Sequence, residues 1–235
     1  LQLFMVQPTP LTSSMWLTGS NTTPRWAYVF LLADCNPHQP TYRGLLYNIL
    51  SATWLLQQYK SRADVVVLVQ MTSAGLVLPE ESLLKELRIH IRYLPPPDHP
   101  PTFYELVMAK FHVLTMVEYS KIIFLDGDVL PLCNLDYLLE LSTSGRLGDT
   151  VLHAMYEDPV NAGLFLITPQ PNDDSLVQWN KSLTQQNRPP IDFRLWNGKV
   201  QSGWDFYCGD SDQGFLLYRS RVWKHRPSAS IIVGS

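Results

Sequence analysis

Cysteine is scarce in this sequence. Cys35, Cys133 and Cys208 are its three cysteines among 235 residues, and they are too dispersed for a disulfide framework or a cysteine-based zinc site. Long apolar runs are also absent, because no stretch of the sequence reaches the roughly 18 residues that cross a bilayer. We therefore expect membrane attachment only through a segment that this sequence does not contain.

An excess of positive charge is absent as well. The sequence has 18 Lys and Arg against 21 Asp and Glu, which gives a formal net charge of −3. Binding to nucleic acid depends on basic residues that neutralise phosphates, so nucleic acid is not an expected partner. The densest basic cluster, residues 219–226, is short and is interpreted as a solvated face.

What is present is the composition of a globular protein, with 46% hydrophobic and 17% charged residues. Residues 1–25 are rich in Thr, Ser and Pro without any periodicity, which predicts a flexible N-terminal tail or stem. Residues 26–235 have one composition and no internal repeat, and their length suffices for a full core. We therefore predict a single domain over residues 26–235.

Strand-like and helix-like segments alternate along this domain. Short apolar or β-branched runs that end at turn residues predict strands at 26–33, 64–69, 88–94 and 121–125. Apolar residues at helical spacing predict helices at 42–59, 79–87 and 103–119. Later elements are expected as helices at 135–141 and 173–185, strands at 151–156 and 163–168, and an irregular loop at 186–211. This alternation predicts an α/β fold with a mostly parallel sheet and helices on both faces.

The segment KIIFLDGDVL places two aspartates at the end of a buried strand. Ligands of parallel α/β sheets bind beyond the carboxyl ends of the strands, and Gly127 leaves room there for a cation and a diphosphate. The carboxylates of Asp126 and Asp128 suit Mg²⁺ or Mn²⁺. The residues alone leave a second interpretation open, because Asp-Gly is also a common turn dipeptide.

Four segments, in this order along the chain, resemble the glycogenin-like members of glycosyltransferase family 8. They are WAYVFLLAD (26–34), MAKFHVLTMVEYSKIIFLDGDVLPLCNLDYL (108–138), NAGLFLITP (161–169) and DQGFLL (212–217). The second segment is long and specific, and the other three are short. The resemblance implies the GT-A fold, a Rossmann-like and mostly parallel sheet of nucleotide-diphospho-sugar transferases, and a retaining transfer reaction.

The resemblance also implies roles for individual residues. Asp126 and Asp128 would bind Mn²⁺ (or Mg²⁺) that bridges the phosphates of a UDP-sugar donor, with Gly127 between them. The other residues that the resemblance assigns to the donor are Ala33 and Asp34 beside the uridine, Lys110 on the donor, Asn161 and Ala162 beside the donor sugar, and Asp212 and Gln213 beside the transferred sugar. Lys110, Asp212 and Gln213 are the predicted catalytic residues.

The reaction implied is transfer of a hexose, with glucose expected, from UDP to a glycan or glycoprotein acceptor. Retention is compatible with a front-face route or with a covalent intermediate on Asp212, and the sequence does not choose between them. Relatives occur in the cytosol and in the Golgi lumen, of which we expect the Golgi, and a homodimer is a possible assembly.

Other interpretations of the same residues remain open. Lys110 also fits a solvated helix face, Asn161 a plain turn, and Asp212 the start of a helix.

The family's His-x-x-Gly-x-x-Lys-Pro-Trp element, which supplies a third metal ligand, has no counterpart before Ser235. We therefore expect a C-terminally truncated domain that binds metal and donor more weakly. An inactive glycosyltransferase-like domain that binds nucleotide or scaffolds a partner is therefore an alternative.

A haloacid-dehalogenase-like phosphatase is a further alternative, because LDGDVL (125–130) also fits its first motif. Asp126 would then be a nucleophile and Asp128 a general acid. That motif normally lies on the first strand of the core, whereas three strand–helix units precede it here. The resemblance to the glycosyltransferases accounts for more of the chain.

Overall fold

The computed structural model describes residues 24–33, 40–70, 76, 78–96, 99–151, 160–188, 204–223 and 230–231. The strands in these ranges are β1 (Trp26–Leu32), β2 (Asp64–Gln70), β3 (His90–Leu94), β4 (Lys121–Leu125), β5 (Thr150–Val151), β6 (Leu164–Ile167) and β7 (Ser230–Ile231). The helices are α1 (Pro40–Gln58), α2 (Leu78–Glu86), α3 (Phe103–Met108), the 3₁₀ helix η1 (Ala109–Thr115), α4 (Asp136–Thr143), α5 (Ser175–Thr184) and α6 (Asp212–Arg221).

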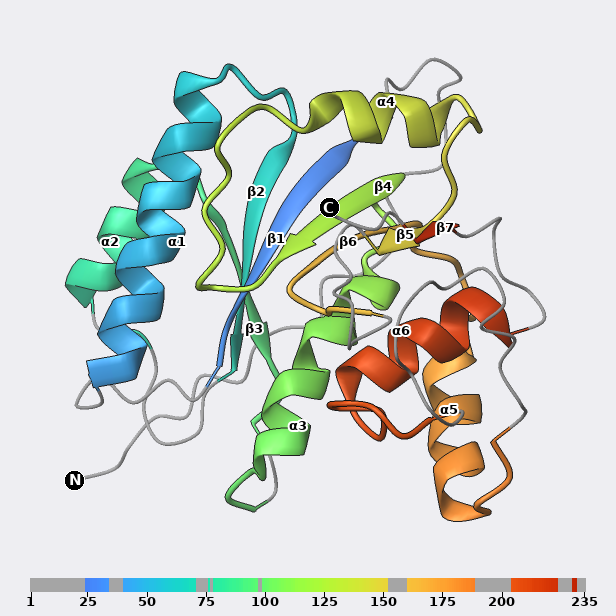
Figure 1. Cartoon of the computed structure of the whole chain (residues 1–235). Coiled ribbons are helices and arrows are strands. Elements are labelled where there is room, and N and C mark those ends of the chain that lie inside the picture. Colours follow the sequence, from blue (N-terminus) through green and yellow to red (C-terminus); the bar gives the residue numbers. More distant parts are fainter. Residues whose placement is uncertain are drawn as a thin grey trace.

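The strands form one seven-stranded sheet in the order β3-β2-β1-β4-β6-β5-β7 (Figure 1). β3, β2, β1 and β4 run parallel. β6 pairs antiparallel with both β4 and β5, and β5 pairs parallel with β7. The predicted mostly parallel sheet is therefore confirmed, and the antiparallel β6 brings the start of that strand beside the carboxyl end of β4.

Each face of the sheet has its own hydrophobic core, because successive side chains of a strand point to opposite faces. In β1, Ala27, Val29 and Leu31 belong to one core, together with residues of η1, α5 and α6. The intervening Tyr28, Phe30 and Leu32 belong to the other core, which α1, α2 and α4 complete. Burial on both faces explains why the central strands are continuous apolar runs.

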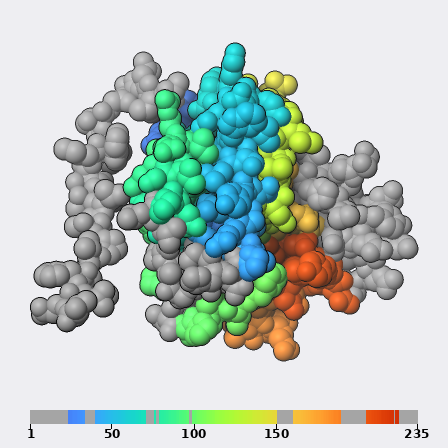
Figure 2. Space-filling view, turned by 90° about the vertical axis from the view of Figure 1, so that its left-hand side faces the viewer, coloured from blue at the N-terminus to red at the C-terminus, as the bar shows by residue number. Residues whose placement is uncertain are grey.

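The helices thus form two layers, one on each side of the sheet. Figure 2 views the molecule from the side that α1 and α2 cover, with α1 in blue beside α2 in blue-green. In Figure 1, α3, α5 and α6 lie together toward the lower edge. No helix within the described ranges combines the length and apolar character that crossing a membrane requires.

The structure differs from the sequence prediction in several elements. The predicted helix at 103–119 is α for its first six residues, continues as the 3₁₀ helix η1 and ends at Thr115. The prediction missed the change of winding because a short apolar pattern does not distinguish 3.0 from 3.6 residues per turn. The strand predicted at 151–156 is described only for Thr150–Val151, and the short strand β7 was not predicted. Residues 1–23 of the predicted tail, and 189–203 of the predicted loop, lie outside the described residues.

The interpretation of residues 219–226 as a solvated face is wrong for Arg219. Its side chain is buried and pairs with Asp149 at 3.2 Å and Asp173 at 2.5 Å, and it also donates to the carbonyl oxygen of Thr168 at 3.4 Å. Asp149 directly precedes β5, Asp173 lies just before α5, and Thr168 directly follows β6. Arg219 therefore fastens α6 to the edge of the sheet and to the start of α5.

Candidate active site

A cleft of about 700 Å³ opens at the carboxyl ends of β1 and β4. It is lined by nine of the ten residues that the sequence predicted for donor binding, namely Ala33, Lys110, Asp126, Gly127, Asp128, Asn161, Ala162, Asp212 and Gln213. The tenth, Asp34, lies outside the described residues. Five separate segments of the chain thus meet at the edge of the sheet where α/β folds bind ligands.

The turn at the end of β4 is fixed from two sides. The backbone N–H of Asp126 donates to the carbonyl oxygen of Gly163 at 2.8 Å, and the side chain of Asn48 donates to the carbonyl oxygen of Gly127 at 2.6 Å. A Cβ atom at Gly127 would lie 2.9 Å from a side-chain carbon of Leu45. A larger residue at position 127 would therefore push the side chain of Leu45 aside, and glycine lets this side chain of α1 pack directly against the turn.

The chain before β6 forms the opposite wall of this part of the cleft. The side-chain oxygen of Asn161 accepts from the backbone N–H of Gly163 at 2.8 Å, so Asn161 makes the turn that the alternative interpretation expected and still lines the cleft. A Cβ atom at Gly163 would lie 3.4 Å from Asp126 Oδ2. The lack of a side chain there keeps the carboxylate of Asp126 accessible.

Lys110 lies at the base of the cleft between two carboxylates. Its Nζ is 3.0 Å from Asp126 Oδ1 and 2.8 Å from Asp212 Oδ2, and 3.4 Å from the carbonyl oxygen of Ala162. The side chain is only 3% exposed, so the solvated helix face considered from the sequence is wrong. Lys110 belongs to η1, in which Ala109, Phe111 and Val113 are also buried.

Burial and charge act in opposite directions on this group. Burial by itself would lower the pKa of Lys110, but the charges of Asp126 and Asp212 outweigh it, and the pKa is raised. Burial raises the pKa of Asp126 against the opposing charge of Lys110. Lys110 is therefore a fixed cation, and Asp126 takes up a proton more readily than an exposed aspartate.

Asp212 and Gln213 begin α6 and bring its first turn to the cleft. Asp212 is the first residue of the helix, and its Oδ1 accepts from the backbone N–H of Gln213 at 2.9 Å. Gln213 is 5% exposed, and its side-chain oxygen has no hydrogen-bond partner in the described structure. A buried acceptor without a partner is unfavourable unless a ligand satisfies it, and Gln213 lines the cleft.

The carboxylates of the cleft fit a divalent cation as part of a ligand set. Asp126 and Asp128 line the same cleft from one turn, and the described residues contain no group of three or more His, Cys, Asp or Glu that would hold a metal ion alone. Mg²⁺ and Mn²⁺ accept hard oxygen ligands and commonly take the rest from phosphates and water. The two carboxylates therefore fit a cation that takes its remaining ligands from a diphosphate.

Sequence reasoning missed several aromatic residues around the cleft. Phe103 and Tyr207 line it and are 69% and 70% exposed, and the buried Tyr42 lines it from α1. For Tyr207 the available signal is the aromatic and glycine content of the predicted loop at 186–211, whereas Phe103 and Tyr42 belong to predicted helices and gave no such signal. Exposed rings at the mouth of a cleft are surfaces on which a planar or apolar ligand face can stack.

Comparison with known proteins gives partial sequence matches and fold matches. No family model matches the chain. UDP-glucuronate:xylan alpha-glucuronosyltransferase 1 of Arabidopsis thaliana is 27% identical over 145 residues, which are 57% of this chain and 21% of the relative. A second Arabidopsis thaliana protein is 29% identical over 136 residues, which are 56% of this chain and 20% of that protein. The chain thus spans about a fifth of the length of these relatives.

Two solved structures share the fold at low sequence identity. An active-site mutant of LgtC superposes with a TM-score of 0.52 and 14% identity over 87% of this chain and 72% of that chain. The bifunctional glycosyltransferase WbbM superposes with a TM-score of 0.52 and 10% identity over 92% of this chain and 40% of its own. These matches favour the predicted GT-A fold over the phosphatase alternative. They show that the chain has the α/β fold of these glycosyltransferases, the predicted GT-A fold, and the partial sequence matches show similarity to the two Arabidopsis thaliana proteins.

Proposed function

We propose that this chain binds a UDP-sugar in the cleft at the ends of β1 and β4 and transfers its hexosyl group, with retention, to a glycan or glycoprotein acceptor. The observation that carries the proposal is the convergence of Asp126, Asp128, Lys110 and Asp212 in one cleft of about 700 Å³. That volume lies within the range of about 300–1,000 Å³ that small-molecule sites occupy.

Asp126 and Asp128 would hold the cation, and Lys110 would hold the diphosphate beside it. A bound Mn²⁺ or Mg²⁺ would supply Lewis-acid neutralisation of the charge that develops on the departing UDP. Lys110 is suited to share that task, because it is a buried cation that is already oriented by two carboxylates. When a cation engages Asp126, the ammonium of Lys110 keeps Asp212 as its partner.

Asp212 and Gln213 would act on the transferred sugar. The carboxylate of Asp212 is held at 2.8 Å from Lys110, where it can stabilise positive charge at the anomeric carbon or attack that carbon. The unpartnered oxygen of Gln213 would accept from a sugar hydroxyl. Gln213→Ala would then lower kcat more than it weakens the binding of UDP.

Glucose is the expected sugar, and glucuronate is a second candidate. With a divalent cation on Asp126 and Asp128, and with Lys110 paired to Asp212, the described lining of the cleft has no further cation to pair with the carboxylate of a uronate, which favours an uncharged sugar. The name of the Arabidopsis thaliana relative favours UDP-glucuronate. Hydrolysis of UDP-glucose and UDP-glucuronate, measured side by side, separates the two candidates.

The experiment that tests the function is titration calorimetry of UDP with and without Mn²⁺, in the parent protein and in Asp128→Asn. We expect binding on the order of micromolar that requires both the metal and Asp128. Glu140→Gln is the matched control, because Glu140 is an exposed carboxylate on α4 that pairs with Arg62 outside the cleft. Absence of UDP binding with Mn²⁺ present would overturn the proposal. Binding without hydrolysis or transfer of any UDP-sugar would favour the inactive, nucleotide-binding alternative.

A further inference from the structure

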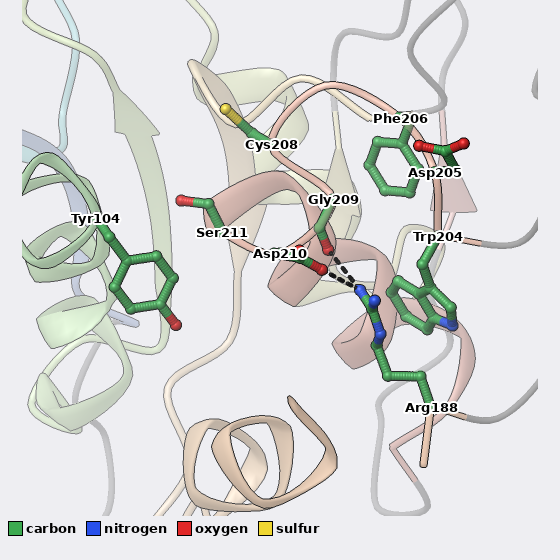
Figure 3. A pocket seen from close by; sticks show the side chains of 9 residues that line it. All are labelled: Tyr104, Arg188, Trp204, Asp205, Phe206, Cys208, Gly209, Asp210 and Ser211. Carbon is green, nitrogen blue, oxygen red and sulfur yellow. Dashed lines mark hydrogen bonds and ion pairs between the residues drawn. The ribbon is translucent and has the colours of Figure 1, made fainter. Parts of the chain in front are cut away.

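A second cleft, of about 540 Å³, adjoins the donor cleft. It is lined by Tyr104, Arg188, Trp204, Asp205, Phe206, Cys208, Gly209, Asp210 and Ser211 (Figure 3). None of these residues is among the site residues predicted from the sequence. The clefts share Cys208, and the neighbouring Phe103 and Tyr104 at the start of α3 line the first and the second cleft respectively.

Aromatic rings face this second cleft from two sides. Figure 3 shows Tyr104 on one side, and Trp204 with Phe206 on the other. Trp204 is held in place by Trp179, with ring centroids 5.4 Å apart, and by the guanidinium of Arg188 at 5.5 Å. Rigid aromatic walls of this kind bind the apolar faces of ligands at a low entropic cost.

Polar groups line the same cleft, and Figure 3 shows Asp210 and Ser211 between Tyr104 on one side and Trp204 with Phe206 on the other. Asp205, Asp210 and Ser211 line the cleft, and the buried hydroxyl oxygen of Ser211 has no partner in the described structure. Burial raises the pKa of Tyr104 against the opposing effect of the Trp179 side chain, and the charges of Asp210 and Asp212 add to the rise; like an ordinary tyrosine, its hydroxyl is protonated at neutral pH. Rings combined with carboxylates and hydroxyls match the surface of a pyranose, which has C–H faces and a rim of hydroxyls.

The charge of the lining narrows the class of ligand. Arg188 forms an ion pair with Asp210, and Asp205 adds a second carboxylate. The described lining therefore carries a net negative charge, which disfavours uronic acids, phosphates and sulfated sugars. An uncharged saccharide meets no such repulsion.

We propose that this second cleft is the acceptor site and that it binds a neutral glycan. The acceptor role rests on the proposed function, whereas saccharide binding does not. Gly209, Asp210 and Ser211 line the second cleft, and the next residue in the chain, Asp212, lines the donor cleft. An acceptor hydroxyl there reaches the donor sugar: its oxygen bonds to the anomeric carbon, the bond to UDP breaks, and UDP leaves with the electron pair and the hydroxyl proton.

The test is binding of neutral oligosaccharides (xylohexaose, cellohexaose and maltohexaose) by saturation-transfer NMR and calorimetry, in the presence of UDP and Mn²⁺. At least one is expected to bind, and an oligogalacturonate is expected not to. Tyr104→Phe removes a hydroxyl group, and Asp210→Asn replaces one charged acceptor oxygen by an amide donor, so each is expected to weaken saccharide binding by about three- to tenfold. The affinity for UDP should stay within about twofold in both variants.

Two control variants match these changes away from the cleft. Tyr47→Phe alters an exposed tyrosine of α1, and Glu140→Gln breaks an exposed pair with Arg62; neither should change saccharide binding. Equal binding by the parent and both cleft variants, or binding of the oligogalacturonate alone, overturns the acceptor site. Failure to bind UDP overturns the proposed function instead, and saccharide binding that is sensitive to Tyr104 and Asp210 would then identify a saccharide-binding domain.

Discussion

Lys110 carries a positive charge into a part of the molecule that water barely reaches. Its ammonium group contacts Asp126 and Asp212, which belong to segments far apart in the sequence. Removal of one partner from a buried ion pair leaves the others as uncompensated buried charges. The same side chain is therefore expected to serve both stability and donor binding.

Lys110→Met should lower the free energy of unfolding by about 3–5 kcal/mol, because the buried carboxylate of Asp212 loses its partner. Adding Asp212→Asn should recover part of that loss, as a double-mutant cycle would show in chemical denaturation. The exposed pair of Arg62 and Glu140 is the control, and Glu140→Gln should cost less than about 1 kcal/mol. A strictly additive double variant would mean that the two side chains do not interact.

His112 adds a pH dependence to stability. Burial, and then the charge of Arg92, lowers the pKa of His112 below the ordinary 6.5. His112 therefore takes up a proton more readily in the unfolded chain than in the folded protein. The free energy of unfolding is unaffected by this group above about pH 6.5, and it declines as the pH falls from there toward the folded-state pKa of His112.

His112→Gln should accordingly lose less stability than the parent between about pH 7.5 and about pH 5.5. Denaturation curves at the two pH values provide the measurement, and His90→Gln, at the exposed start of β3, is the control. An unchanged pH dependence in His112→Gln would show that other groups cause the loss.

At the scale of elements, the turn before α6 depends on close contacts between backbones. A Cβ atom at Gly214 would lie 1.9 Å from the carbonyl oxygen of Gly209, and one at Gly209 would lie 2.2 Å from the carbonyl oxygen of Trp204. The segment 204–211 is thereby folded back on the first turn of α6. Both clefts take part of their lining from this segment.

Gly214→Ala should therefore lower the free energy of unfolding by about 1–3 kcal/mol and weaken the binding of both UDP and saccharide. Gly44→Ala is its matched control, because Gly44 lies on α1 with nothing within 4 Å of its Cβ position. That change should stabilise the protein by about 0.5–1 kcal/mol. Thermal and chemical denaturation of the two variants would test the contrast, and destabilisation by both would contradict it.

The sequence predicted the elements best where burial dictates the residue types. β2 and β4 are apolar runs that end at polar residues, and their predicted bounds match the structure to within a residue. The convergence of Asp126, Lys110 and Asp212 in one cleft followed from the family resemblance, since spacing alone does not bring residues from distant segments together.

Other features depend on tertiary packing and leave little trace in the local pattern. The second cleft is built from side chains on either side of residues 189–203 and from Tyr104 on α3. No periodicity reports the closeness of these groups. The burial of Arg219 was missed for the same reason, because its carboxylate partners lie 46 and 70 residues away along the chain.

At the scale of the whole molecule, Arg219 connects the layer of α5 and α6 to the antiparallel edge of the sheet. Arg219→Met should lower the free energy of unfolding by about 3–5 kcal/mol, since Asp149 and Asp173 would be left buried without their partner. Arg219→Lys should recover only part of this, because lysine lacks the forked geometry that contacts both carboxylates. Chemical denaturation of both variants gives the measurement, and full recovery by lysine would contradict the geometric argument.

The double attachment of the turn after β4 has a kinetic consequence. Asn48 holds the carbonyl of Gly127, and the carbonyl of Gly163 holds the amide of Asp126, so the metal-binding turn has its shape before any ligand arrives. Little conformational entropy remains to be lost there on binding, and association with UDP should not wait for a slow rearrangement of this turn. Deuterium exchange at the amide of Asp126 should accordingly be slow in the free protein and change little when UDP is added.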